Sequence, residues 1–124
     1  MPGQRVVTIG LLPEAVDFSK FPGLDAEKLM AGIAAQTAEL RAEGFDTHVC
    51  LTDAGATAEA VVTQMLQDLT PDVIVFGAGV RTSPEHLLLF ERLLNLAHRL
   101  APQAALCFNT RPTDSLAAVR RWAA

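Results

Sequence analysis

The residues with the clearest chemical potential follow two apolar runs in the second half of the chain. A turn with two glycines and an arginine follows Val73–Phe76, and a polar triplet follows a run that ends at Phe108. Free backbone amides at a tight turn, together with guanidinium groups, favour an anion such as phosphate or carboxylate. The residues expected to bind this anion are Gly77, Gly79, Arg81, Ser83, Asn109, Thr110 and Arg111.

A histidine and a carboxylate add the groups that proton transfer needs. His86 lies near the start of an expected helix, on its apolar side and at the end that would face the anion site, and Asp17 lies in a long loop near the N-terminus. If the two side chains met, they would permit general acid–base catalysis, so both are candidate catalytic residues. The simpler interpretations are a histidine bonded to a backbone carbonyl and a solvated loop carboxylate. The site hypothesis requires Arg81, His86 and Arg111 to line one cavity.

A strict alternation of strand-like and helix-like segments must position these residues. The expected strands are Arg5–Gly10, Thr47–Leu51, Val73–Phe76 and Gln103–Phe108, and the expected helices begin after Asp25, Thr57, Ser83 and Thr113. Alternation with short turns and no hairpin signal predicts a parallel sheet with helices on both faces. We expect one Rossmann-like or flavodoxin-like α/β domain over residues 1–124, a three-layer sandwich with four parallel strands in the order 2-1-3-4. The first and fourth helices would cover one face, and the second and third the other.

The expected strand order also predicts where a ligand would bind. Ligands of open α/β sheets bind outside the carboxyl ends of the strands where the order reverses, here between the first and third strands. The segment from Leu11 to Gly23 would flank this point, and it is longer than the usual strand-to-helix loop of about two to six residues. Its apolar residues Val16, Phe18 and Phe21 are expected to fold back over a pocket.

Composition and charge limit the classes of partner. The 124 residues carry a net charge of −4, and 50% of them are apolar and 19% charged. One ordered domain with its own core fits these values, whereas the scattered basic residues provide no surface for nucleic acid. No apolar run approaches the roughly 20 residues that span a bilayer, and no signal peptide is apparent. We therefore expect a cytoplasmic protein that binds neither nucleic acid nor membranes.

The cysteines and the third expected helix bear on structure more than on chemistry. Cys50 and Cys107 lie inside apolar runs and are expected to be reduced core residues. The histidines show no zinc-ligand spacing and no Cys-x-x-Cys occurs, so no metal site is expected.

The third expected helix is apolar over about half its circumference, with Leu88 facing solvent. This breadth and the low charge content favour a homo-oligomer, expected to be a dimer.

Known uses of this fold narrow the function. A response-regulator receiver needs an acidic pair after the first strand and an aspartate after the third, where this chain has Gly10-Leu11-Leu12 and Phe76-Gly77. A flavodoxin needs a Thr/Ser-rich phosphate loop after the first strand, and this chain has Leu-Leu-Pro-Glu there. An NADP-type dinucleotide site is a weaker alternative, since Gly77–Thr82 matches two of the three glycines of G-x-G-x-x-G.

Two turns carry a resemblance to other chains. The run Gly77-Ala-Gly-Val-Arg81 and the run Asn109-Thr-Arg-Pro-Thr-Asp114 resemble those of short bacterial Rossmann-like α/β proteins without an assigned activity. The resemblance implies the same fold and the same turns, and it transfers no catalytic residue.

The leading functional hypothesis is therefore a domain that binds a small anionic metabolite or nucleotide at the carboxyl edge of its sheet. An acid–base pair of His86 and Asp17 would allow the protein to transform that ligand as well. No Ser-His-Asp set, Walker lysine or metal cluster is present, so both an enzyme and a binding protein fit these residues, and no cofactor is indicated. The alternative is a non-catalytic homo-oligomeric or interaction subunit.

Overall fold

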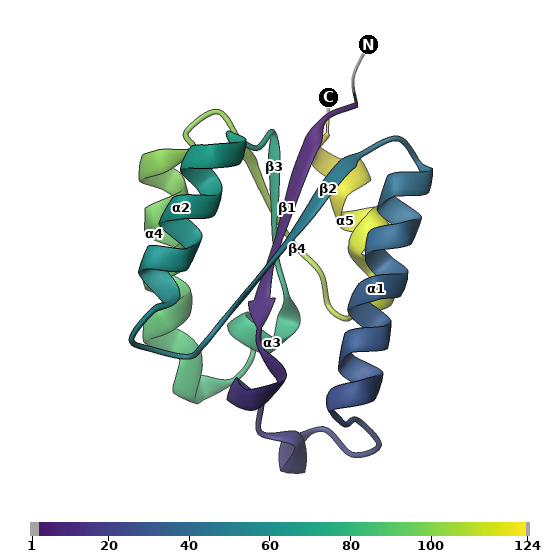
Figure 1. Ribbon diagram of the computed structural model, residues 1–124, viewed down its shortest axis with the longest axis vertical. Coiled ribbons are helices and arrows are strands. Elements are labelled where there is room, and N and C mark those ends of the chain that lie inside the picture. The colour runs from purple at the N-terminus through teal and green to yellow at the C-terminus, as the bar shows by residue number, and fades with distance from the viewer. Residues whose placement is uncertain (1–2, 124) are drawn as a thin grey trace.

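The computed structural model describes residues 3–123 and contains a four-stranded parallel sheet between two layers of helices (Figure 1). The strands are β1 (Arg5–Leu11), β2 (Asp46–Thr52), β3 (Val73–Phe76) and β4 (Ala105–Phe108). Their order is β2-β1-β3-β4, and each pairing is parallel. The predicted fold class and strand order are confirmed.

The helices divide between the two faces as expected. Helices α1 (Ala26–Ala42) and α5 (Ser115–Trp122) contact each other on one face, and α2 (Ala58–Leu69) and α4 (Leu87–Leu100) contact each other on the opposite face. Short 3₁₀ turns connect several elements: η1 (Pro13–Ala15), η2 (Phe18–Lys20), η3 (Pro84–His86) and η4 (Pro112–Asp114).

The glycine turn after β3 differs from the expectation. Residues Ala78–Arg81 form a one-turn helix, α3, and Pro84–His86 form η3, so α4 begins only at Leu87. The side chain of Ser83 makes no capping hydrogen bond. The turn therefore enters its long helix through two short helical segments, unlike a glycine loop that opens directly into a helix.

Each face of the sheet has its own core. The core under α2 and α4 is the larger and includes β-strand residues such as Val7, Ile9, Ile74 and Phe76. The core under α1 and α5 is smaller: Val6, Leu40, Val73, Val75, Cys107, Ala118 and Val119. The strand residues Val73–Phe76 are buried on both faces, which explains their unbroken apolar run.

The unequal cores follow from the way α1 packs. Only Thr37 and Leu40 are buried in this helix, and both lie in its second half. The first half has partly exposed residues facing the sheet, including Leu29 and Ile33. The first half of α1 thus stands away from the sheet, while the second half is anchored to it.

Some residue-level expectations are confirmed and others are wrong. Cys50 and Cys107 are free and buried, and burial raises the pKa of each thiol to about 11, as expected of core residues. Trp122, the last residue of α5, is 60% exposed, and Leu87, in the helix that is expected to be apolar over about half its circumference, is 55% exposed. Thr57 was expected to cap α2, but its hydroxyl donates to Asp53.

None of the helices within residues 3–123 has the length and the apolar character that crossing a membrane requires.

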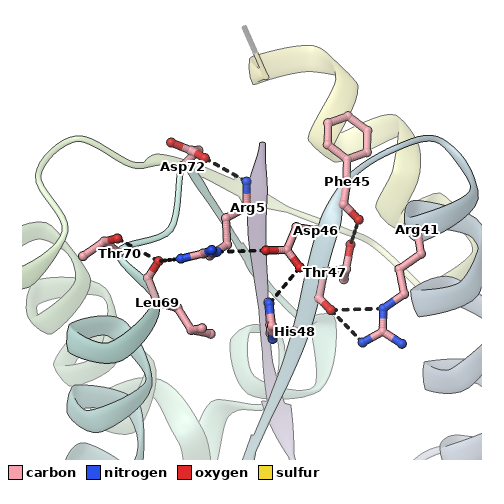
Figure 2. A network of polar contacts seen from close by, with 9 residues as sticks. All are labelled: Arg5, Arg41, Phe45, Asp46, Thr47, His48, Leu69, Thr70 and Asp72. Carbon is pink, nitrogen blue, oxygen red and sulfur yellow. Dashed lines mark hydrogen bonds and ion pairs between the residues drawn. The ribbon is translucent and has the colours of Figure 1, made fainter. Parts of the chain in front are cut away.

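The amino ends of the strands are joined by a polar network around Arg5 (Figure 2). The Arg5 side chain donates to Asp46 on β2 at 2.9 Å and to the carbonyl of Leu69, the last residue of α2, at 2.6 Å. Its backbone N–H donates to Asp72 at 2.7 Å, and Asp46 also pairs with His48 at 3.0 Å. These contacts lie at the edge of the sheet opposite the expected ligand site, and they join β1, β2 and the end of α2.

Candidate functional site

A cavity of about 270 Å³ lies between the first half of α1 and the sheet. Its floor consists of residues from the carboxyl halves of β1, β2 and β3. The cavity therefore occupies the point where the strand order reverses between β1 and β3, on the side of the sheet that α1 and α5 cover. This is the position at which open α/β sheets bind ligands.

The cavity exists because three elements place glycine there. Gly10 on β1, Gly77 after β3 and Gly32 on α1 all line it. A Cβ atom at Gly10 would lie only in ordinary contact with Leu51, at 3.4 Å from its Cδ2 atom. Side chains of β1 alternate between faces, so a side chain at Gly10 would share the face of Thr8 and enter the cavity.

The long loop after β1 closes one side of the cavity. Val16, Phe21 and Leu24 line it, which agrees with the expected folding back of the loop. Phe18, also expected there, is partly buried but does not line the cavity. An ion pair of 2.7 Å between Lys20 and Glu85 ties the loop to η3.

Two cations stand where the cavity opens to solvent, which we call the mouth. Lys28 in the first turn of α1 and Arg111 after β4 both line the cavity and are exposed. The Lys28 ammonium donates to the carbonyl of Gly23 at 3.0 Å. Within residues 3–123 the Arg111 guanidinium makes no hydrogen bond or ion pair. The mouth thus carries positive charge with donors left for an anion.

Asn109 and Ser115 form a hydrogen-bonded relay along the wall of the cavity. The Asn109 Oδ1 accepts from the backbone N–H of Ala78 at 2.9 Å, and its Nδ2 donates to Ser115 Oγ at 2.8 Å. Ser115 Oγ in turn donates to Gln36 Oε1 on α1. The relay connects α3, the end of β4, α5 and α1, so Asn109 fixes the shape of the cavity. It also occupies the Ala78 amide that was expected to be free for an anion.

Thr110 lines the cavity beside Asn109, but its polar groups are directed to Asp114. The Thr110 hydroxyl and backbone N–H both donate to the Asp114 carboxylate. Although burial raises it, these hydrogen bonds bring the pKa of Asp114 below its ordinary value, with a smaller contribution from the charge of Arg111. The carboxylate is therefore ionised at neutral pH and holds the turn after β4.

Arg81 supports the end of β4 and does not line the cavity. Its Nη2 donates to the carbonyl of Asn109 at 2.7 Å, and its guanidinium carbon lies 5.8 Å from the centroid of the Phe108 ring. Ser83 is buried and also lies outside the cavity lining. Of the residues expected to bind an anion, the structure brings Gly77, Gly79, Asn109, Thr110 and Arg111 to one cavity.

The two candidate catalytic residues lie elsewhere. Asp17 is exposed and accepts from the hydroxyl and the N–H of Ser19, and the hydroxyl bond lowers the pKa of Asp17. His86 is partly exposed in η3, and neither residue lines the cavity. Arg81, His86 and Arg111 therefore do not line one cavity, and the structure gives the acid–base pair no support.

Several lining residues were not identified from the sequence. Thr8 lies inside the expected strand Arg5–Gly10, and Lys28 and Gln36 lie in the helix expected after Asp25, but none of the three is assigned to a site from the sequence. The available signals were a threonine among β-branched apolar residues and Gly32 inside a helix, where glycine is unfavourable unless space is needed.

The chain matches no model of a known protein family and no curated protein. Its cavity is therefore interpreted from the residues that line it. The polar ones are Thr8, Lys28, Gln36, Asn109, Thr110 and Arg111. The lining contains no carboxylate, histidine or cysteine, and no group of three or more metal-ligating side chains occurs within the described part of the chain.

Proposed function

We propose that the protein binds a small organic anion in the cavity between α1 and the sheet. The apolar body of the ligand would lie among Val49, Leu51, Val75, Leu29 and Ile33, and its carboxylate or phosphate would lie at the mouth. The observation that carries this proposal is the combination of an apolar interior with two exposed cations, Lys28 and Arg111, at one end. Apolar clefts with a few convergent polar groups are the usual form of small-molecule sites.

The size and lining of the cavity favour the binding of a small metabolite over the binding of a dinucleotide cofactor. Ligand pockets commonly measure about 300–1,000 Å³, so a cavity of about 270 Å³ suits a small metabolite. The Ala78 amide, which a bound pyrophosphate would need, is already bonded to Asn109. The lack of a carboxylate, a histidine and a cysteine among the lining residues supports a binding function ahead of a catalytic one.

A simple probe for this site is 3-phenylpropanoate, with 3-phenylpropylamine as its cationic counterpart. We expect the anion to bind, as measured by calorimetry and by NMR shifts of lining amides, and the amine not to bind. Exposed charge pairs are worth up to about 1 kcal/mol, so Lys28→Gln and Arg111→Gln should each weaken binding about twofold to fivefold. Arg99→Gln, an exposed arginine on α4, is the control and should leave binding unchanged.

A second variant tests the location of the ligand. Gly10→Val should fill the cavity from its floor and abolish binding, because its Cβ atom would meet only the flexible end of Leu51, at 3.4 Å, and its methyl groups would enter the cavity that Gly10 lines. Gly55→Val, at a position with no atom within 4 Å of an added Cβ, is the control. Unchanged affinity in Gly10→Val, or equal binding of the amine and the anion, would refute the proposal.

Self-association is a second candidate function, and specific exposed residues favour it. Leu87 and Leu88 on α4 are 55% and 65% exposed, and Phe108 on the edge strand β4 is 36% exposed. We propose a homodimer through this side of the molecule in the cytoplasm. Sedimentation of the wild type and of Leu88→Glu tests it: a monomer for the wild type would refute the dimer.

A further inference from the structure

The outer edge of β2 carries backbone groups that the sheet does not use. β2 is an edge strand, paired with β1 on one side only. The carbonyl of Thr52 accepts from the N–H of Leu12, the residue after β1, so the even-numbered residues of β2 direct their backbone groups to β1. The alternate residues therefore direct theirs away from the sheet. They are Thr47, Val49 and Leu51.

This edge is only partly protected against pairing with another strand. The Thr47 carbonyl accepts from Arg41 at 3.2 Å and 2.8 Å (Figure 2), and the other outward N–H and C=O groups of β2 make no hydrogen bond to any of residues 3–123. Native edge strands commonly carry a lysine, a proline or a bulge that prevents such pairing. Residues 47–51 contain none of these. The edge is thus a template for a further strand.

A groove of about 460 Å³ follows this edge, with a helix on each side. His48 and Val49 line it, and their side chains lie on opposite faces of the sheet, so the groove crosses the edge from one face to the other. In Figure 1, β2 lies between α2 on the left and α1 on the right. Met65 on α2 lines the groove, as does Met30 on α1, which is 42% exposed. A strand added here would be covered by side chains from both layers of helices.

The face of α1 beside the groove is self-complementary when a second α1 lies antiparallel to it. Met30, Ala34, Ala38 and Arg41 line the groove and are exposed, and exposed Glu27 lies one turn before Met30 on the same face. Ala34 is midway between the carboxylate and the guanidinium. In the described part of the chain, neither charged group forms an ion pair. An antiparallel second helix would bring the carboxylate of each copy to the guanidinium of the other.

We infer that the edge of β2 is the contact surface for a second copy of this chain. The two β2 strands would run antiparallel about a two-fold axis at Val49, with Val49 bonded to its counterpart and the Thr47 N–H bonded to the Leu51 carbonyl. A two-fold contact requires a surface that complements itself, as this one does in its backbone groups and its charges. The contact does not depend on a ligand, and it lies at the edge of the sheet opposite to Phe108.

The test is the size of the protein, measured by sedimentation velocity over a range of concentrations. The wild type should be a dimer. Ala34→Glu would bring two carboxylates together at the axis and should weaken the dimer by about tenfold or more. Ala35→Glu is the control, because Ala35 is the next exposed residue of α1 and does not line the groove. Ala35→Glu and Leu88→Glu should leave this contact unchanged.

Charge reversal tests the antiparallel arrangement of the two α1 helices. Glu27→Arg and Arg41→Glu should each weaken the dimer, because each brings like charges together across the axis. An equimolar mixture of the two variants should associate more tightly than either variant alone, since position 27 of each chain then meets an opposite charge at position 41 of the other.

The other outcomes would overturn the inference. A monomeric wild type would do so, and would leave the edge to a strand of another protein. A dimer that persists in Ala34→Glu and dissociates in Leu88→Glu would place the contact at α4 instead. A mixture of the two charge variants that associates no better than each alone would refute the antiparallel contact.

Discussion

Asn109 is the residue on which the shape of the candidate site depends most. It is 5% exposed, and its side chain bonds in two directions, to the Ala78 amide and to Ser115. Its backbone carbonyl also accepts from Arg81. A residue type that the sequence marked as a ligand contact thus acts first as a structural link between the turn after β3 and the start of α5.

Replacing Asn109 by alanine should therefore destabilise the protein rather than simply weaken binding. The change leaves the Ala78 amide and the Ser115 hydroxyl without their partners, and an unpaired buried group costs about 1–3 kcal/mol. We expect a loss of about 2 kcal/mol or more in the free energy of unfolding, measured by urea denaturation.

Asn95→Ala is the matched control. Asn95 is an exposed asparagine on α4 that bonds only to a carbonyl of its own helix, that of Glu91. Its substitution should change the stability by less than about 0.5 kcal/mol. Similar losses for both variants would contradict the structural role of Asn109.

At the level of elements, the junction at the amino ends of the strands holds β1, β2 and α2 together through Arg5 (Figure 2). The Arg5 guanidinium bonds the carbonyl of the last residue of α2, where a cation is favourable to the helix dipole, and the carboxylate of Asp46. The hydrogen bond from Arg5 lowers the pKa of Asp46, and the charge of His48 acts in the same direction. The junction is thus a structural counterpart to the site at the opposite edge of the sheet.

This junction predicts a loss of stability in acid. A carboxylate with a lowered pKa in the folded state stabilises the protein above its unfolded pKa of about 4, and the contribution disappears as the pH falls through the folded pKa. The pKa values of Asp17, Asp46, Asp53, Glu85 and Asp114 are all lowered. We expect the urea midpoint to be nearly constant from pH 7 to about pH 5 and to fall below about pH 4.

Asp46→Asn isolates the contribution of the junction. It should lower the urea midpoint at pH 7 and have a smaller effect at pH 3, because the contribution of a carboxylate with a lowered pKa declines once the pH is below its unfolded pKa. In a double-mutant cycle with Arg5→Gln, the coupling should be measurable at pH 7 and smaller at pH 3. A coupling that is the same at both pH values would show that the Arg5–Asp46 ion pair does not contribute.

At the level of the whole molecule, the fold could be predicted from the sequence because its signals are local and repeated. Apolar strand runs alternate with capped helical segments, and this pattern permits few topologies other than a parallel sheet with covered faces. The switch point between β1 and β3, the folding back of the loop at Val16 and Phe21, and the place of the turns after β3 and β4 at one edge all follow from that topology.

The detailed site could not be predicted in the same way. Arg81 and Arg111 follow neighbouring strands and look equivalent in sequence, yet the Arg81 side chain turns towards Phe108 and only Arg111 reaches the cavity. The sequence places His86 in the first turn of a helix that begins at Pro84, whereas Pro84–His86 form the 3₁₀ turn η3, α4 begins only at Leu87, and His86 does not line the cavity. The cavity itself depends on the distance between α1 and the sheet, and the spacing of apolar residues along the sequence does not predict that distance.

The glycines around the cavity have a consequence for the relation between stability and activity. A glycine inside a strand costs roughly 0.5–1 kcal/mol relative to alanine, and a Cβ atom at Gly10 would meet no atom closer than Leu51 Cδ2, at 3.4 Å. Gly10→Val should therefore raise the midpoint of thermal unfolding in the same variant that loses the ligand. A raised midpoint would mean that the protein keeps its site open at a cost in stability, and selection for thermal resistance alone would be expected to fill the cavity. An unchanged or lower midpoint would contradict this.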